Sequence, residues 1–192
     1  MSHTLEVHLL GGLSIRQDGE PLNEFSSSKE PALFTYLVCT QKSYPREVLA
    51  ELFWPERSPE QSRSNLRTLL SRIRRTALGD YLHITRSEVA LNPEHDYWLD
   101  VAAFQAQLTA IKARLGGSQQ LSRLGAEQLD QTLRLYQGEF LAGFYLGDSY
   151  AFEEWVSLQR EALHRDAVEA LRLLVAYDLD AGRCAAAVAH AM

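Results

Sequence analysis

Five arginines lie close together between Gln61 and Gly79, and no aspartate or glutamate interrupts them. A guanidinium group pairs with phosphate oxygens and can form a forked hydrogen bond to guanine in the major groove of DNA. The hydroxyl and amide side chains among the arginines add short hydrogen bonds to phosphates or bases. The segment therefore predicts nucleic-acid contacts from Arg63, Ser64, Asn65, Arg67, Thr68, Ser71, Arg72, Arg74 and Arg75.

Charge is distributed unevenly along the 192-residue chain, whose formal net charge is −6. Outside the arginine segment, the chain has 14 basic and 25 acidic side chains. Such an acidic remainder would suppress indiscriminate binding to DNA, so binding should depend on docking of this one segment. A second interpretation stays open, in which the arginines form a solvated helix face and pair with nearby carboxylates.

The arginine segment has the periodicity of an amphipathic helix over 59–78. At about 100° per residue, its apolar side chains gather on one face. The apolar residues are Leu66, Leu69, Leu70, Ile73 and Ala77, and the opposite face carries Ser64, Thr68, Ser71 and Arg75. Arg67 and Arg74 flank this polar face at one edge, and Arg72 flanks it at the other.

The elements before this helix are short. Alternating apolar residues over 5–9 and 13–16 predict two strands, and Asp18-Gly19 predicts a two-residue turn, so a small antiparallel sheet opens the chain. Ser26–Ser28 can cap a helix that begins near Lys29, since Pro31 fits only in a first turn. A loop at 44–45 and a helix over 46–53 follow.

Two short strands, 81–85 and 89–92, follow the arginine helix and predict a hairpin whose connection contains Arg86. A helix-turn-helix followed by a hairpin is a winged helix. In such an arrangement one helix enters the major groove, and Arg86 can reach the neighbouring backbone.

Everything after residue 97 is predicted to be helical. Asp100 can cap the first helix, 116–118 breaks the pattern, and a glycine-containing loop precedes a long helix over 152–180. A further helix begins after Gly182 and stops at Met192, which suggests a fragment of a longer protein. The aromatic residues of the loop and the long helix predict either core packing or a ligand pocket: Phe140, Phe144, Tyr145, Tyr150, Phe152 and Trp155.

The sequence offers little for catalysis. It contains no GxxxxGK[ST], GxGxxG, HExxH or GxSxG motif, and its six histidines are scattered. The neighbouring Glu153 and Glu154 do not share a helix face and are predicted to be solvated charges. We therefore predict no enzyme, no cofactor and no metal.

The two cysteines, Cys39 and Cys184, are far apart in sequence and predict buried free thiols in a cytoplasmic protein. No apolar stretch approaches the roughly 18 residues that a membrane span needs. We therefore predict no membrane association.

Several separated segments resemble one family of bacterial regulators. The first half resembles the OmpR-type winged helix of the Streptomyces antibiotic regulatory protein (SARP) family in three segments. These segments are 29–37, Pro45-Arg46-Glu47-Val48-Leu49-Ala50-Glu51-Leu52-Phe53-Trp54-Pro55 and 64–75. The second half resembles the bacterial transcriptional activator domain of the same family in Trp98-Leu99-Asp100-Val101-Ala102-Ala103-Phe104, Tyr136-Gln137-Gly138-Glu139-Phe140-Leu141 and 155–165. The implied fold is an α+β winged helix-turn-helix with small antiparallel sheets over 1–97, followed by an all-α, tetratricopeptide-like domain over 98–192, truncated at its C-terminus.

The resemblance implies a transcriptional activator that binds repeated promoter elements as side-by-side copies, including a homodimer on DNA, and that contacts RNA polymerase. It makes the arginine helix the recognition helix, Arg86 a wing residue and Lys29 a DNA contact. Glu30 and Pro31 stand where the family usually has a second basic residue. An alternative is a protein-interaction or signalling module of a larger multidomain regulator that no longer binds DNA specifically.

Overall fold

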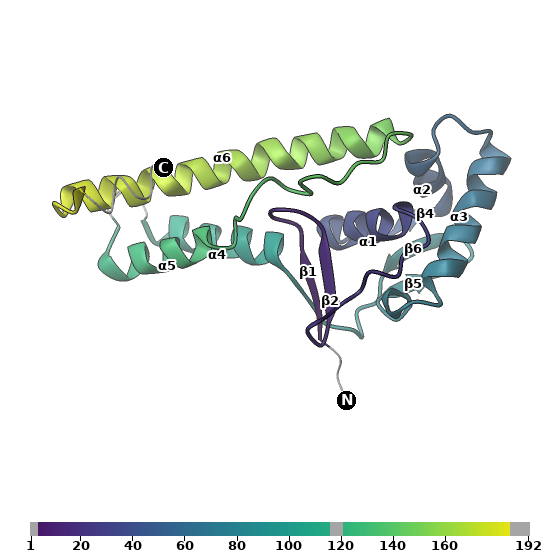
Figure 1. Ribbon diagram of the computed structural model, residues 1–192, viewed down its shortest axis with the longest axis horizontal. Helices are drawn as coiled ribbons and strands as arrows, with labels where there is room; N and C mark the ends of the chain where they lie inside the picture. The colour runs from purple at the N-terminus through teal and green to yellow at the C-terminus, as the bar shows by residue number, and fades with distance from the viewer. Residues whose placement is uncertain (1–3, 116–120, 185–192) are drawn as a thin grey trace.

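The computed structural model describes residues 4–115 and 121–184 (Figure 1). A sheet with strand order β3-β2-β1-β7 lies between the two ends of the elongated molecule. Its strands are β1 (Leu5–His8), β2 (Ser14–Gln17), β3 (Glu20–Pro21) and β7 (Tyr97–Leu99). The turn predicted at Asp18-Gly19 is confirmed, because both residues have positive φ, 53° and 84°.

The prediction of a purely antiparallel sheet, with only helices after residue 97, is wrong. Strand β7 pairs with β1 in parallel, with Leu5 opposite Tyr97 and Val7 opposite Leu99. Local alternation reveals a strand but not its partner, and this partner lies far away in the sequence. A division of the chain at residue 97 therefore falls at the start of a strand that belongs to the first sheet, and it stays a prediction.

Three helices follow the first hairpin: α1 (Lys29–Thr40), α2 (Arg46–Phe53) and α3 (Pro59–Ile73). The predicted starts of α1 and α2 are confirmed. The predicted end of α3 at Leu78 is wrong, because Thr76 donates both its N–H and its hydroxyl to the carbonyl of Ile73, at 2.9 and 2.8 Å. The chain then tightens into a 3₁₀ turn, η1 (Ala77–Gly79), which buries Leu78.

The second sheet has the strand order β4-β6-β5. Strands β5 (Leu82–Ile84) and β6 (Glu88–Leu91) form the predicted hairpin. The loop predicted at residues 44–45 is instead the short strand β4 (Tyr44–Pro45), in which Tyr44 pairs with Val89. An edge position suits this strand, since Pro45 has no N–H to donate to a further strand.

The helical half contains α4 (Asp100–Leu115), α5 (Arg123–Leu133) and α6 (Tyr150–Asp180). In Figure 1, α4 and α5 lie along one end of α6, and the other end of α6 reaches α2. Helix α6 ends before Gly182, whose φ is 71°, as predicted. The break at 116–118 and the helix expected after Gly182 lie outside the described residues. None of the helices in the described ranges is long and apolar enough to cross a membrane.

Asp100 joins the first sheet to the helical half. Its carboxylate is buried and accepts hydrogen bonds from the N–H groups of Leu9, Leu10 and Val101, at 2.7, 2.8 and 2.7 Å. Burial raises the pKa of Asp100, and the three backbone donors oppose that rise. Asp100 therefore does more than the predicted capping of a helix, because it also holds the end of β1 against the start of α4.

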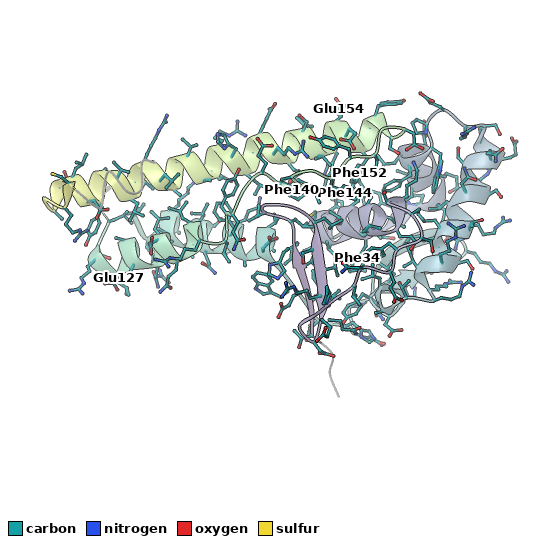
Figure 2. All side chains as sticks on the ribbon, viewed as in Figure 1. Phe34, Glu127, Phe140, Phe144, Phe152 and Glu154 are labelled. Carbon is teal, nitrogen blue, oxygen red and sulfur yellow. The ribbon has the colours of Figure 1, made fainter. Side chains whose placement is uncertain are left out.

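An aromatic cluster packs the two halves together. The ring of Trp155 lies 4.9 Å from that of Tyr36, and the ring of Phe152 lies 5.5 Å from that of Phe53. Figure 2 shows Phe140, Phe144 and Phe152 gathered where α6 approaches α1. Core packing is thus confirmed for these three residues and Trp155, whereas Tyr145 and Tyr150 are 65% and 67% exposed.

Both cysteines are free thiols, as predicted. Cys39 is half-buried, and burial raises its pKa to about 12. The prediction that both are buried is wrong for Cys184, which is exposed just after the end of α6.

Candidate nucleic-acid interface

Helix α3 presents its polar face to solvent. Pro59 occupies its first turn, and the hydroxyl of Ser58 accepts a hydrogen bond from the N–H of Gln61, so the start is well capped. The opposite face of the helix is buried and consists of Ser62, Leu66, Leu69, Leu70 and Ile73. The predicted contact residues are exposed, apart from the half-buried Asn65: Arg63, Ser64, Arg67, Thr68, Ser71, Arg72, Arg74 and Arg75.

Three of these arginines are uncommitted within the protein. The side chains of Arg63, Arg67 and Arg72 form no hydrogen bond and no ion pair with any residue in the described ranges. Their charge is therefore available to a ligand, and a phosphate would not have to displace a carboxylate from them.

Two arginines at the end of α3 have local partners. Arg74 donates from Nη2 to the carbonyl of Ile84 at 2.7 Å, which ties α3 to strand β5. Arg75 donates to the carbonyl and hydroxyl of Ser71, at 3.1 and 3.4 Å. The structure thus gives Arg74 a positioning role that its place in the sequence did not reveal.

The tip of the β5–β6 hairpin is shaped by Thr85. Its hydroxyl accepts hydrogen bonds from the N–H groups of Ser87 and Glu88, at 3.3 and 3.0 Å. Arg86 is exposed in this turn and has no polar partner among the residues that the structure describes. The hairpin therefore carries a free cation next to the end of α3.

Arg46, at the start of α2, is a basic residue that sequence reasoning missed. Burial lowers its pKa, and the positive charges of Arg74 and Arg67 lower it further. Its Nε is buried and has no hydrogen-bond partner in the described part of the chain. Arg46 thus adds to the positive charge along one flank of α3, and no local pattern signals this because its neighbours come from another helix.

Lys29 is placed elsewhere than the resemblance implied. Its side chain is 13% exposed, and its ammonium donates to the carbonyl of Phe53, to Asp148 and to the hydroxyl of Ser149, at 2.6, 2.7 and 2.9 Å. It also lies 5.0 Å from the ring of Trp54. We therefore correct its assignment from a DNA contact to a bond between the two halves of the chain.

The neighbouring Glu30 does not place a negative charge on the surface. It is buried, and its carboxylate accepts a hydrogen bond from the N–H of Ser26 at 3.2 Å. Ser28 occupies the capping position of α1 without forming a side-chain cap, so the predicted cap is right in place but not in mechanism.

No group of three or more metal-ligating side chains occurs within residues 4–115 and 121–184. Glu153, predicted to be solvated, accepts a hydrogen bond from the N–H of Leu146. Glu154 is exposed and points away from the body of the molecule in Figure 2.

Comparison with known proteins identifies one domain and a similar fold. Residues 99–192 match the bacterial transcriptional activator domain. The fold is similar to that of Mycobacterium tuberculosis EmbR in complex with a low-affinity phosphopeptide, with a TM-score of 0.75 and 23% sequence identity. That match covers 98% of this chain and 49% of the EmbR chain, so the chain spans about half the length of this neighbour. No curated protein matched the sequence.

The second half of the chain carries a bacterial transcriptional activator domain, and the chain has the fold seen in this part of EmbR.

Proposed function

We propose that this chain is a transcriptional activator that binds double-stranded DNA as a winged helix, with α3 in the major groove and the β5–β6 hairpin as the wing. The observation that carries the proposal is the set of uncommitted guanidinium groups on α3, at Arg63, Arg67 and Arg72. Pairing of these groups with nearby carboxylates, the alternative left open by the sequence, finds no support among the described residues.

The faces of α3 suggest distinct roles in such a complex. Arg67, Ser64 and Ser71 lie on the exposed side, from which base edges are read in a major groove. Arg46 and Arg74 line one flank, which suits contact with phosphates. Arg86 at the hairpin tip would meet the backbone next to the groove.

The match of the second half to a bacterial transcriptional activator domain suggests its partners. We propose that it contacts RNA polymerase and that a second copy of the chain binds beside the first on promoter repeats. The acidic remainder of the chain would keep non-specific binding to DNA weak.

The test uses the whole chain, because β7 pairs with β1 and a cut at residue 97 would remove most of that strand. Genomic fragments bound by the chain are selected, and affinity for one of them is measured over a series of salt concentrations. We expect Arg67→Ala to weaken binding about tenfold, in line with the loss of one base or phosphate contact. Its thermal midpoint should stay at that of the parent, since the side chain is exposed and makes no internal bond.

Arg172→Ala is the matched control, because Arg172 is an exposed arginine on α6 without a polar partner among the described residues. Equal affinity of the parent, Arg67→Ala and Arg172→Ala would refute the role of α3. Failure of the parent to select any fragment at low salt would favour the interaction-module alternative.

A further inference from the structure

A groove of about 510 Å³ separates one flank of α3 from the loop that precedes α6. One wall comes from the first half of the chain, with Asn65 and Arg72 of α3. The other wall comes from the helical half, with Tyr145, Gly147 and Asp148. The groove therefore brings the predicted recognition helix next to a segment of the activator domain.

The loop wall is held firmly against the first half. Lys29 donates to Asp148 and to Ser149, at 2.7 and 2.9 Å. The hydroxyl of Ser149 donates to the carbonyl of Phe53 at 2.9 Å, and Glu153 accepts the N–H of Leu146. These bonds fix the loop to the last residue of α2 and to the first turn of α6, so the groove is a built feature of the free chain.

The groove offers hydrogen-bond donors and positive charge. Arg72 has no ion pair with a described residue, and the amide of Asn65 lies on the same flank of α3. Tyr145 is 65% exposed, and the guanidinium of Arg160 lies 5.5 Å from its ring. Asp148 is the one carboxylate in the lining, and it is already paired with Lys29. A phosphodiester is the anion that this arrangement suits.

The dimensions of an α-helix and of the DNA major groove indicate that a phosphodiester would lie at this protein groove. A helix with its side chains is about 10–12 Å across, and the major groove of DNA is about 12 Å wide. When α3 lies in the major groove, each of its flanks therefore meets one sugar–phosphate backbone. The flank with Asn65 and Arg72 is the one that the loop faces.

We propose that the loop at residues 145–148 of the helical half binds the sugar–phosphate backbone beside Asn65 and Arg72, so that both halves of the chain form the DNA interface. This inference rests on the proposed DNA binding by α3. It makes the activator domain a direct contributor to affinity, besides any contact with other proteins.

Gly147 is the position to alter, because a Cβ added there meets no heavy atom within 4 Å. Gly147→Glu and Gly147→Lys place opposite charges in the groove, and Gly147→Ala controls for the loss of glycine. Ala113→Glu and Ala113→Lys are the matched charge controls, since Ala113 is exposed in the last turn of α4. Binding of the whole chain to a selected genomic fragment is followed by fluorescence anisotropy over a salt series.

We expect Gly147→Glu to weaken binding about threefold at about 100 mM salt, and Gly147→Lys to tighten it by a similar factor. One added phosphate contact should steepen the log–log salt dependence of Gly147→Lys by about 0.9. Gly147→Ala should bind as the parent does, because it adds no charge. Both Ala113 variants should also bind as the parent does, because the Debye length is about 10 Å at this salt concentration.

Parent-like binding by both charged Gly147 variants, together with weaker binding by Arg67→Ala, would overturn the backbone contact and leave DNA binding by α3 intact. Equal effects of the Gly147 and Ala113 charges would also overturn it, since only long-range attraction would then remain. Failure of the parent to bind any fragment would overturn both proposals.

Discussion

Replacement of Asp100 by asparagine tests the bond between the first sheet and the helical half. Asp100 is 2% exposed, and its two oxygens accept three backbone N–H groups from Leu9, Leu10 and Val101. An asparagine amide has one oxygen and one NH₂ group, so at least one of these N–H groups must face another donor. Each buried donor left unsatisfied costs about 1–3 kcal/mol, so we expect a loss of about 2–4 kcal/mol.

Urea unfolding measures this loss, followed by tryptophan fluorescence and by circular dichroism. With a denaturant slope of about 2 kcal/mol per molar, the unfolding midpoint should fall by about 1–2 M. Asp96→Asn is the control, because Asp96 is exposed and has no polar partner in the described part of the chain. Coincident midpoints for Asp100→Asn and Asp96→Asn would refute the reasoning, since the three short bonds would then contribute no net stability.

Three further predictions concern other internal contacts. Lys29→Met should lower the free energy of unfolding by about 1–2 kcal/mol, because it removes a charged donor that bonds the Phe53 carbonyl and the Ser149 hydroxyl. The same change at the exposed Lys42 should leave the urea midpoint in place. At pH 8 a disulfide reagent should modify Cys184 rapidly and Cys39 slowly, because a pKa of about 12 leaves the Cys39 thiol almost wholly protonated; two equally fast thiols would contradict this. Gly79→Ala should cost about 1–3 kcal/mol in thermal unfolding, because its Cβ would lie 2.8 Å from backbone at the end of α3, and an unchanged melting temperature would count against that packing.

Much of the candidate interface was predictable because it is local. The spacing of Leu66, Leu69, Leu70 and Ile73 fixes which face of one helix is buried, and the exposed face follows from the same period. The β5–β6 hairpin with Arg86 also follows from short-range signals. Neither feature depends on a residue from a distant part of the chain.

Other assignments required partners that are remote in sequence. Strand β7 is a strand because β1 lies beside it, and its three residues carry too little alternation to show this. Lys29 faces Asp148 and Ser149, and Arg46 lies near Arg67 and Arg74. A single sequence does not contain these distances, so a lysine that binds DNA and a lysine that joins two halves look alike in it.

The sequence by itself determined that an acidic chain carries an amphipathic helix with an acid-free arginine segment from Gln61 onward, followed by a hairpin. Periodicity and charge are properties of neighbouring residues, so they can be determined from the sequence before the fold is known. The tertiary structure decided which cations are uncommitted and which are bonded internally, because that depends on where carboxylates and carbonyls from other elements lie. It also decided that the loop at residues 145–148 lies beside α3, since packing of the aromatic cluster and the hydrogen bonds of Lys29 hold the loop and the start of α6 in that position.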